Sequence, residues 1–598
     1  MYESGMGAYG VRVRDDDLWE TVHMATLLEL YLARRGLTAE SYDDLDDGRH
    51  GALLRADEMV RRLREVHDSG ERIVVLPDYD MDGICSGVIG LAGLSQLGFN
   101  VSLFIPDPSK GYGFGEGEVD RLVREHPGVA HVITCDTGVR EGPGCRRLAE
   151  LGVDVLVTDH HMEDPDDNVR QWASVVVDPC CYDDPYRLKG ICGAHVLWQV
   201  LAMYARAYGD AHDREAIMRL RVFAGMGTVS DVMPLEHENR QLVRDSVSIS
   251  RLCWANGSTW YLSTFSECCH LYRSAMYGVH CVMEALSDAR KLSSPQDIDE
   301  ELFAFYVAPC FNSVKRLGLP MRMAFDVFFG TEQMSAAREI VKTNESRKRL
   351  ERDTMRVIKG SDQRLAPFVY VLKDAKPGVL GLLAGSLQRL HNMPCVVVNK
   401  REDGSWSGSG RSPEWYRFYT RTRAVGFDPR GHEVAFGFSC KDDAELFRLY
   451  AFLKEDVERV REETRLARER GEIPPAQPDY DFVIDDSGHG DTPIDTDAFE
   501  EFIEACDDFR PFGKGFEPPK ALLRFNLAES DIRKLGKDRS HVKFVLREGF
   551  EVICFGQASV VDAGLPETVS VIGSLGINEF RGERHVQMQG DIETGGLS

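Results

Sequence analysis

Short apolar runs that end in acidic residues recur in the first third of the chain. They are RIVVLPDYD (72–80), HVITCDTG (131–138), VDVLVTDHH (153–161) and ASVVVDP (173–179). Stretches with helical rhythm separate them, such as CSGVIGLAGLSQLG (85–98) and EVDRLVREHPG (118–128). Strands that alternate with helices are typical of βαβ units wound into a parallel sheet. The pattern therefore predicts an α/β domain whose polar residues lie at the carboxyl ends of its strands.

The rest of the chain shows three further patterns. Residues 331–360 have the pattern of one long basic helix. A second α/β unit follows, with FVYVL (368–372) and CVVVN (395–399) as its strands and a charged helix over about 441–470. Residues from about 518 to 598 contain several short β-rich runs, which predict a small barrel.

Composition places the chain among globular proteins. It has 598 residues, 43% hydrophobic and 28% charged, enough for several cores. No run reaches the roughly 18 apolar residues of a membrane span, and the acidic N-terminus is unlike a secretory signal. The 15 scattered cysteines indicate reduced thiols and a cytoplasmic protein.

Charge is distributed unevenly along the chain. The net charge of −26 argues at first against a polyanionic partner. However, residues 479–508 alone hold twelve acids and no Lys or Arg, whereas 311–424 hold 21 bases and 11 acids, and 510–543 hold nine bases and four acids. The basic segments are compatible with a path for nucleic acid. The acidic segment could be a flexible strap, a mimic of nucleic acid that occupies the binding groove, or a tail that binds a partner.

Residues 241–308 hold several Cys and His residues in a mostly helical pattern. These are Cys253, Cys268, Cys269, His270, His280 and Cys281. Their spacing matches no paired C-x-x-C motif, so ordinary buried thiols are favoured over a zinc site.

Acids and histidines follow the predicted strands in four separate places. They are Asp78, Asp80 and Asp82; Asp136; Asp159, His160 and His161; and Asp231. One such Asp is typical of a cap or a turn, but carboxylates that share one sheet edge repel each other unless a cation neutralises them. Oxygen ligands with one or two imidazoles suit Mg²⁺ or Mn²⁺, and a pair of such ions can cleave a phosphoester.

The order of these motifs resembles that of the DHH phosphoesterases. DYDMDG, CDTG, TDHH, GICGAH and GTVSDVMPLEHENR follow one another as in that family, and specifically as in its RecJ branch, the exonucleases of single-stranded DNA. KPGVLGLLAGSLQRLHNMPCVVV (376–398) and GSGRS (408–412) resemble the DHH-associated domain. RPFGKGFEPP (510–519) and LGKDRSHVKF (535–544) resemble the RecJ oligonucleotide-binding barrel.

The resemblance implies a domain order. We expect an N-terminal helical segment over 1–70, a DHH catalytic domain over 71–330 with a helical insertion at about 241–308, and a connecting helix over 331–365. A DHH-associated substrate-binding domain over 366–470 follows, and then an acidic linker and the oligonucleotide-binding barrel over 471–598.

The resemblance also implies residue roles. The metal ligands are expected to be Asp78, Asp80, Asp82, Asp136, His160 and Asp231, with Asp136 bridging two Mn²⁺ or Mg²⁺ ions. His161 is expected at the scissile phosphate, with Asp159 orienting an imidazole. The substrate phosphates are expected to meet Ser409, Gly410, Arg411, Ser412, His432 and Arg316. The GSGRS segment is interpreted as a turn whose amides approach a phosphate. Phe512 and Phe516 are candidates for base stacking, with a position in the core as the equal alternative for each.

Some positions depart from the family pattern. Leu76 stands where many relatives in the wider superfamily have His, and Ala375-Lys376 stands in place of a Trp-His pair. Pro108, Lys315 and Arg430 replace an Arg, a Gly and a Gly of the pattern. Most of these positions belong to substrate contacts, so they affect the expected rate and the end and length preference more than the reaction class.

The resemblance thus implies an exonuclease that degrades single-stranded DNA from the 5′ end to mononucleotides, in DNA repair and recombination. A DHH phosphodiesterase of short RNA or cyclic dinucleotides is the alternative, and a non-catalytic scaffold is a third. The expected protein is a cytoplasmic monomer that acts on single-stranded DNA, with a single-strand-binding protein or a helicase as candidate partners and no membrane contact.

Overall fold

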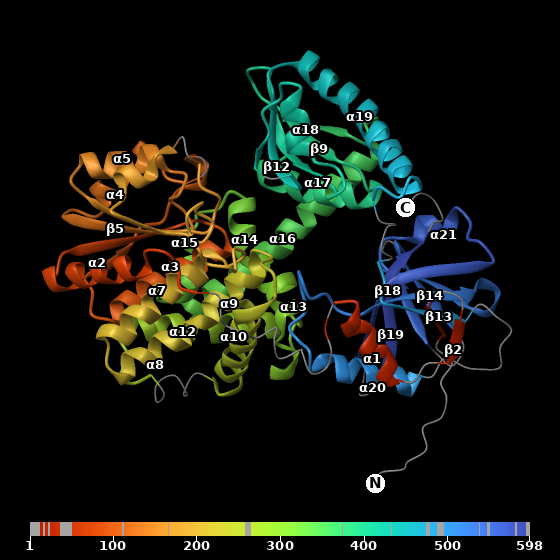
Figure 1. Cartoon of the computed structure of the whole chain (residues 1–598), viewed down its shortest axis with the longest axis horizontal. Helices are drawn as coiled ribbons and strands as arrows, with labels where there is room; N and C mark the ends of the chain where they lie inside the picture. Colours follow the sequence, from red (N-terminus) through yellow and green to blue (C-terminus); the bar gives the residue numbers. More distant parts are fainter. Residues whose placement is uncertain are drawn as a thin grey trace, which may run out of the picture. The chain divides into compact units, whose positions relative to one another are not determined.

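The computed structural model describes most of the chain. The described residues are 12–15, 18–21, 24–35, 37, 51–110, 113–164, 167–257, 265–373, 375–431, 433–473, 479–486, 496–536, 539–546, 550–580 and 583–593. They form two compact units (Figure 1). The larger unit comprises residues 49–233 and 242–474, and the smaller unit comprises 1–48, 234–241 and 475–598. None of the helices described is long and apolar enough to cross a bilayer.

The larger unit begins with the predicted parallel sheet. Its strands are β3 (Arg72–Pro77), β4 (Val101–Leu103), β5 (Val129–Cys135), β6 (Asp154–Thr158) and β7 (Val175–Val177), in the order β4-β3-β5-β6-β7. All neighbouring pairs are parallel. The chain winds outward from β3 in both directions, so β3 and β5 are neighbours at a topological switch point, where open α/β sheets bind their ligands.

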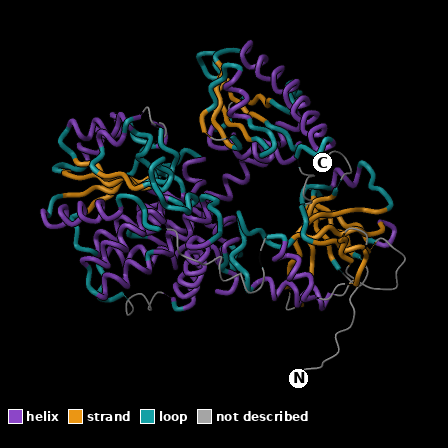
Figure 2. Tube along the Cα trace, viewed as in Figure 1, coloured by secondary structure: helices purple, strands orange, loops and turns teal. Residues whose placement is uncertain are grey.

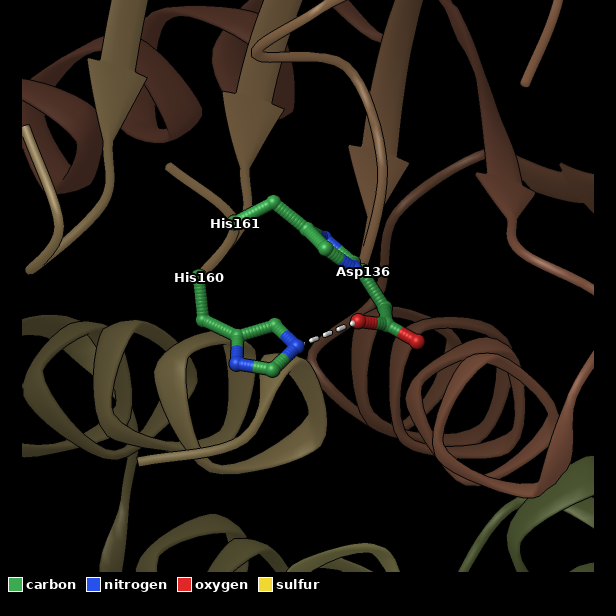
Figure 3. A group of neighbouring side chains, drawn as sticks. All are labelled: Asp136, His160 and His161. Carbon is green, nitrogen blue, oxygen red and sulfur yellow. Dashed lines mark ion pairs between the residues drawn. The ribbon is translucent and has the colours of Figure 1, made fainter. Parts of the chain in front are cut away.

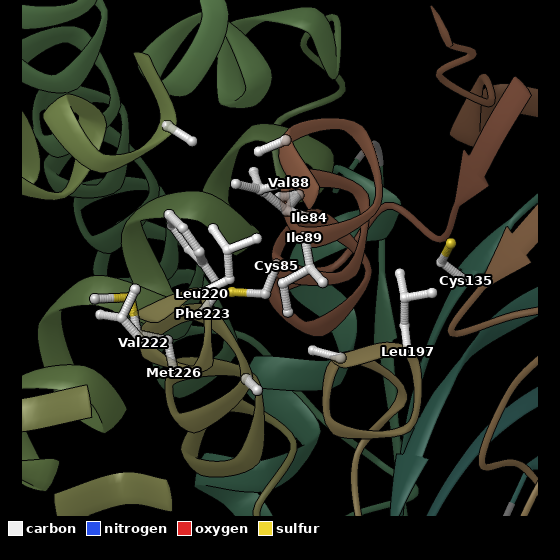
Figure 4. Packing of buried hydrophobic residues seen from close by; sticks show 14 of the residues in the cluster. Ile84, Cys85, Val88, Ile89, Cys135, Leu197, Leu220, Val222, Phe223 and Met226 are labelled. Atoms are coloured by element: carbon white, nitrogen blue, oxygen red, sulfur yellow. The ribbon is translucent and has the colours of Figure 1, made fainter. Parts of the chain in front are cut away.

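Helices cover both faces of this sheet (Figure 1). Ile73 and Val75 of β3 join a core with α2 (Ala56–Ser69), α3 (Met81–Gln96) and α7 (Gly193–Tyr208). Val74 and Leu76 face the opposite core, under α4 (Glu116–Glu125) and α5 (Gly142–Glu150), and α6 (Val169–Trp172) lies beside it. Because successive side chains of a strand alternate between faces, an unbroken apolar run serves two cores. Figure 4 shows how α3 and neighbouring helices interlock in the first core.

A helical subdomain completes the first half of the larger unit (Figure 2). Its helices are α8 (Ala211–Arg219), α9 (Arg221–Ser230), most of α10 (His237–Ala255), α12 (His270–Asp288), α13 (Glu300–Leu302), α14 (Ala308–Arg316), α15 (Arg322–Phe329) and α16 (Gln333–Gly360), with a π-helical turn at Phe303–Val307. The cysteines are free thiols. In the 241–308 segment, Cys253, Cys268 and Cys281 are buried and Cys269 is partly exposed.

A second, mixed sheet forms the end of the larger unit. It comprises β8 (Val369–Leu372), β9 (Cys395–Lys400), β10 (Trp406–Arg411), β11 (Arg430–Gly431) and β12 (Ala435–Cys440), in the order β11-β12-β10-β9-β8. Only β8 and β9 are parallel, and α17 (Pro377–His391) connects them. Helices α18 (Phe418–Ala424) and α19 (Asp443–Glu469) follow. The chain therefore has the predicted α/β architecture, with α16 leading from the first α/β domain to the second.

The segment GSGRS is the end of a central strand and not the turn that its glycines suggested. Ser409 pairs with Val397 on one side and with Gly437 on the other. A Cβ atom at Gly410 would lie 2.0 Å from the ring of Phe436. This glycine therefore lets an aromatic ring pack on the strand, and its backbone is engaged in the sheet.

The smaller unit contains the C-terminal β-rich region. Its elements are β1 (Arg12–Asp15), β2 (Leu18–Thr21), α1 (Met24–Ala33), β13 (Phe482–Asp486), α20 (Thr496–Asp507), β14 (Lys520–Asn526), β15 (Asp531–Leu535), β16 (His541–Val545), β17 (Glu551–Cys554), α21 (Ala558–Asp562), β18 (Thr568–Phe580) and β19 (Glu583–Ile592). Seven strands pair in the order β13-β14-β18-β19-β17-β16-β15. One hydrophobic cluster forms the core of this unit.

The expected N-terminal helical segment over 1–70 is divided between the two units. Helix α2 packs in the first core of the larger unit, whereas residues 1–48 belong to the smaller unit. The hydroxyl of Tyr31 donates to the carbonyl of Glu517 at 2.8 Å, and Arg35 pairs with Asp481 at 2.8 Å. Leu27 and Tyr31 are buried in the core of the smaller unit, which explains the helical rhythm of this region.

The acidic stretch 479–508 provides secondary structure to the smaller unit. Its described residues contain β13, which pairs in parallel with β14, and α20. Asp479 pairs with Lys520 at 2.9 Å, and Glu504 pairs with Arg584 at 2.8 Å. Part of the negative charge of this stretch is therefore offset by bases of the same unit.

Phe512 and Phe516 are core residues, which is one of the two alternatives that the sequence left open. Their side chains are 7% and 1% exposed, and their rings stack on each other with centroids 5.9 Å apart. The guanidinium of the buried Arg240 lies 4.5 Å from the centroid of Phe516. By contrast, Phe555 is 57% exposed and has the ring of His541 beside it.

A buried carboxylate holds the segment after β10 in place. Asp456 of α19 accepts hydrogen bonds from the hydroxyl of Tyr416 at 2.9 Å and from Arg421. The hydroxyl of Ser412 donates to the carbonyl of Tyr416 at 2.8 Å. Asp456 thus fixes the residues that follow Arg411.

We expect Asp456→Asn to destabilise the larger unit by about 2 kcal/mol, because a charged hydrogen-bond acceptor is lost. Burial opposes the charge of Asp456, but Arg421 and Tyr416 lower its pKa. The carboxylate therefore stabilises the fold above the ordinary Asp pKa, and this contribution is lost as the pH falls through the lowered value. Thermal unfolding at pH 7 and at low pH measures both effects. Glu455→Gln, an exposed change on the same helix, is the control, and equal melting temperatures for the two variants would contradict the assignment.

Candidate metal centre

Three carboxylates follow the end of β3. Asp80 is the N-cap of α3, and its Oδ1 accepts from the amides of Asp82 and Gly83 at 3.0 and 3.1 Å. Asp78 is only 4% exposed, and within the described residues its Oδ1 has no hydrogen-bond partner. A buried carboxylate oxygen without a donor needs another source of positive charge.

Asp82 lies where two helices begin. It belongs to the first turn of α3, and its two oxygens accept from the amides of Gly193 and Ala194, at the start of α7, at 2.7 and 3.2 Å. A Cβ atom at Gly227 of α9 would lie 2.3 Å from Oδ1 of Asp82, so only glycine leaves room for this carboxylate. The motifs GICGAH and GTVSD thus both contribute to the position of Asp82.

Asp136 follows β5 in a left-handed conformation. Its φ is 62°, and its amide donates to the carbonyl of Thr158 at 3.0 Å. Asp tolerates this conformation better than most residues. A Cβ atom at Gly193 would lie 2.5 Å from Cβ of Asp136, so the start of α7 also packs directly against this residue.

His160 lies among carboxylates of separate segments, and Figure 3 shows its ring facing Asp136. Its Nε2 lies 3.1 Å from Oδ1 of Asp136, 3.6 Å from Oδ2 of Asp231 and 3.9 Å from Oδ2 of Asp82. Asp231 is the C-cap of α9. Three groups of potential ligand atoms each fall within 4.8 Å: Asp136, His160 and His161; Asp82, His160 and Asp231; and Asp78, Asp80 and Asp136. All six expected metal ligands therefore meet at the switch point of the sheet.

The protein alone does not neutralise this cluster. Burial raises the pKa of Asp78 to about 8, and the charge of Asp80 adds to the rise. Burial also raises the pKa values of Asp82 and Asp136. Burial lowers the pKa of His160, which favours the neutral imidazole that a metal needs. Carboxylate oxygens with one or two imidazoles fit Mn²⁺ or Mg²⁺, so these residues suit such ions.

His161 and Asp159 form a charged pair beside the cluster. Nδ1 of His161 lies 2.7 Å from Oδ1 of Asp159, and the amide of Val139 donates to Oδ2 of Asp159 at 2.9 Å. Burial opposes the charge of His161, but Asp159 more than compensates and raises its pKa to about 10. Burial likewise opposes the charge of Asp159, yet the two imidazoles lower its pKa to about 2. The pair therefore presents an imidazolium at neutral pH.

Two buried acids near this pair were not assigned from the sequence. Burial raises the pKa of Glu141 to about 7, and its carboxylate accepts from the amide of Gly138 at 2.8 Å. Burial raises the pKa of Asp178 to about 8, and Asp178 accepts from the amide of Cys180 at 2.7 Å. Asp178 comes directly after the fourth apolar run, so its position in the sequence could have marked it as a candidate. Glu141 does not follow a predicted strand, so no sequence pattern pointed to it.

The expected substrate-binding residues divide into two groups. Arg316 ends α14 and Arg411 ends β10, and they lie close enough that Arg411 contributes, after burial and Arg347, to lowering the pKa of Arg316 to about 10. Ser409 is half-buried beside them on β10. Ser412 is 5% exposed and bonded within its own loop, and Gly410 is buried in the sheet. His432 lies outside the described residues.

We expect the chelated protein to lose thermal stability as the pH rises from about 6 to about 9. The native carboxyls have raised pKa values and keep protons that the unfolded chain releases above its ordinary pKa of about 4. Stability therefore falls with pH until the native groups ionise near 8. Saturating Mn²⁺ should remove this dependence, because the ion supplies the missing charge.

Asp136→Asn tests the cause of that pH dependence. Without metal, this variant should lose less stability between pH 6 and 9 than the unaltered protein, although it binds Mn²⁺ more weakly. Asp57→Asn, an exposed change on α2, should leave both properties unchanged. Calorimetry in chelator and in Mn²⁺ measures the effect, and identical pH profiles for the two variants would contradict a crowded carboxylate cluster.

Two protein families match separate parts of the chain. Residues 72–223 match the N-terminal domain of the DHH family, and residues 491–591 match the RecJ OB domain. The first match contains five of the six candidate ligands, and Asp231 follows its end. The second match contains α20 and most of the seven-stranded sheet.

Similar proteins cover nearly the whole chain. The single-stranded-DNA-specific exonuclease RecJ of Bacillus subtilis is 26% identical over 96% of this chain and 68% of its own length, and that of Escherichia coli is 25% identical over 90% and 89%. The crystal structure of Thermus thermophilus RecJ with Mn²⁺ matches 96% of this chain and 77% of its own, with a TM-score of 0.68 and 24% identity. A structure of exonuclease RecJ bound to manganese matches 68% of this chain and 96% of its own, with a TM-score of 0.52 and 25% identity. Both family matches and the near full-length similarity agree with the motif order: the chain contains a domain of the DHH family and a RecJ OB domain, and it is similar to RecJ exonucleases over most of its length.

Proposed function

We propose that this protein is a metal-dependent exonuclease that degrades single-stranded DNA from the 5′ end to mononucleotides. The observation that carries the proposal is the meeting of six metal-ligating side chains at the switch point of the parallel sheet. The relatives in Bacillus subtilis and Escherichia coli are described as single-stranded-DNA-specific exonucleases, which supports the same substrate here. The direction of cutting follows the resemblance of the motifs to that family.

The residues that would hold two Mn²⁺ or Mg²⁺ ions are those of the candidate centre, with Asp136 as the proposed shared ligand. They are Asp78, Asp80, Asp82, Asp136, His160 and Asp231. When bound, such ions offset the carboxylate charge, activate a water for attack on phosphorus and stabilise the leaving oxygen. The buried oxygen of Asp78 without a donor and the raised pKa values fit this need for cations.

His161 is the proposed proton-bearing group at the scissile phosphate. Asp159 engages its Nδ1 at 2.7 Å, which fixes the orientation of the ring. With a pKa of about 10, the imidazole carries a proton at neutral pH. It can therefore donate a hydrogen bond to the phosphate and stabilise the negative charge that develops as the ester bond breaks.

Arg411 of the second α/β domain and Arg316 at the end of α14 are proposed to bind the phosphates of the strand. Arg411 extends from the end of β10 along α17, where a Cβ atom at Gly381 would lie 3.1 Å from its Nη2. Its Nη1 donates to the carbonyl of Gly410, and within the described residues no carboxylate pairs with it. Arg316 likewise has no ion pair within the described residues, so both guanidinium groups remain for phosphate oxygens.

The smaller unit supports a polymeric substrate. Domains of the OB type bind single strands with basic grooves and stacking aromatics. The exposed Phe555, with the ring of His541 5.3 Å away, is the aromatic group that we assign to base stacking in place of Phe512 and Phe516. The match of residues 491–591 to the RecJ OB domain supports this assignment.

The cellular setting follows from the same resemblance. We infer that the protein acts in the cytoplasm as a monomer, in DNA repair and recombination. The single-stranded DNA on which it acts would be exposed by a helicase or presented by a single-strand-binding protein. The free thiols support a reducing compartment.

We expect the protein to degrade a 5′-labelled single strand with early release of the labelled nucleotide. A 3′-labelled strand should shorten progressively instead. Mn²⁺ or Mg²⁺ should support the reaction and a chelator should stop it. Denaturing gels of both strands, with a duplex of the same sequence as the control, test substrate, direction and metal together.

The same digestion separates the proposal from its alternatives. Cleavage of short RNA or a cyclic dinucleotide with no cleavage of long single strands would favour a small-substrate phosphodiesterase. Inactivity on all of these substrates, with strand binding retained, would favour a scaffold. Asp136→Asn should reduce the rate at least a hundredfold and keep strand binding, because loss of a shared ligand removes several kcal/mol of transition-state stabilisation.

We expect Arg411→Ala to raise KM and to weaken the salt dependence of strand binding. Loss of one phosphate contact on a single strand should reduce the slope of log K against log salt by about 0.7. Fluorescence anisotropy over a salt series measures the slope. Arg401→Ala, a change at an exposed position beyond β9 in the same domain, is the control, and an unchanged slope would exclude Arg411 from the phosphate path.

A further inference from the structure

A lysine lies at the rim of the metal centre. Lys315 stands in the last turn of α14, next to Arg316. Its ammonium nitrogen is 3.7 Å from the ring centroid of Tyr79, the residue between Asp78 and Asp80. Lys315 interacts electrostatically with both carboxylates. The ammonium is thus fixed beside two candidate metal ligands that belong to a distant part of the sequence.

The ring of Tyr79 holds this ammonium without neutralising it. Tyr79 is 3% exposed, so the ring is a rigid surface. An aromatic face attracts a cation but accepts none of its charge. Lys315 is exposed, and within the described residues its ammonium makes no hydrogen bond and no ion pair. Its N–H groups that point away from the ring remain available for an anion.

Two further cations without carboxylate partners continue from Lys315. Arg316 is the next residue, and Arg411 is close enough to affect the pKa of Arg316. A Cβ atom at Gly378 would lie 2.2 Å from the carbonyl oxygen of Arg316, so the start of α17 packs on this turn and brings the second domain to it. Nearby, Arg347 differs, because it pairs with Glu351 at 2.9 Å. Three unpaired like charges repel one another, and this arrangement is stabilised when an anion binds among them.

We propose that Lys315 binds a phosphate of the strand next to the metal centre, and that Lys315, Arg316 and Arg411 form one row of cations along the strand. This inference rests on the proposed function. The lysine lies on the catalytic domain and Arg411 on the second domain, so the row connects the position of cleavage with the grip on the strand. Ions on Asp78 and Asp80 would remove the attraction of Lys315 to these carboxylates and leave it to the phosphate.

The first test compares Lys315→Gln with Lys315→Arg on a short single strand. We expect Lys315→Gln to lower kcat/KM about tenfold, mainly through KM, and to reduce the salt slope of strand binding by about 0.7, as for one lost phosphate contact. Lys315→Arg should restore most of both. Lys348→Gln is the matched control, because Lys348 also lies over a tyrosine ring, that of Tyr306, but pairs with Glu345 at 3.2 Å. It should behave like the unaltered protein.

The second test locates the phosphate. Strands that carry a single uncharged methylphosphonate linkage at successive positions are compared in the unaltered protein and in Lys315→Gln. At one linkage near the cleaved end, the neutral substitution should weaken binding to the unaltered protein and have no further effect on Lys315→Gln. All other linkages should affect the two proteins equally.

Two outcomes would overturn the inference. One is a salt slope and a methylphosphonate profile for Lys315→Gln that equal those of the unaltered protein. The other is a change confined to the Mn²⁺ concentration for half-maximal activity, which would make Lys315 a counter-charge of the metal site. Because strand binding is measured by anisotropy with saturating Mn²⁺ in the weakly active Asp136→Asn background, the result does not depend on cleavage. If the unaltered protein cleaves no strand, the proposed function is wrong. The binding data then still show whether Lys315 contacts a phosphate of the strand.

Discussion

The crowding of buried carboxylates at one sheet edge is the constraint on which the larger unit depends. β3 and β5 are neighbours because the chain winds away from β3 in both directions, so the residues after both strands must meet. Burial then makes each negative charge costly, and the raised pKa values of Asp78, Asp82 and Asp136 express that cost. If this site bound no cations, apolar side chains at these positions would make the folded state more stable than the buried carboxylates do.

The surrounding backbone offsets part of this cost. The starts of α3 and α7 both lie at Asp82, and helix N-termini favour negative charge. Gly193 and Gly227 allow this approach, since a Cβ atom at either position would overlap the carboxylate of Asp136 or Asp82. Yet the pKa of Asp82 remains raised. The two helix ends therefore fix the position of the carboxylate but do not neutralise the cluster. A site with both properties is ordered before an ion binds and still attracts the ion.

Sequence reasoning succeeded for features that nearby residues determine, and it failed for features that depend on contacts between distant parts of the chain. The ends of parallel strands share an edge, so the order of acidic motifs was enough to predict the centre. Gly410 was misread because its neighbour Phe436 lies on a strand that is adjacent only in space. The role of Phe516 stayed open because this residue packs against Tyr31 and Arg240, which lie hundreds of residues away in sequence. The N-terminal segment was taken as one piece because its two halves have similar helical rhythm and differ only in the unit against which they pack.

The same distinction applies to charge. A net charge of −26 describes the chain as a whole, whereas a strand of DNA meets only the cations within reach. In the smaller unit, acids such as Asp479 and Glu504 are paired with bases of that unit. In the larger unit, Lys315 and Arg316 come from one helix and Arg411 from a strand of the other domain. All three lie in the basic segment 311–424, but almost a hundred residues separate Arg316 from Arg411. The charge count of this segment was compatible with a nucleic-acid path, whereas the proximity of these particular cations arises from the folding of the larger unit.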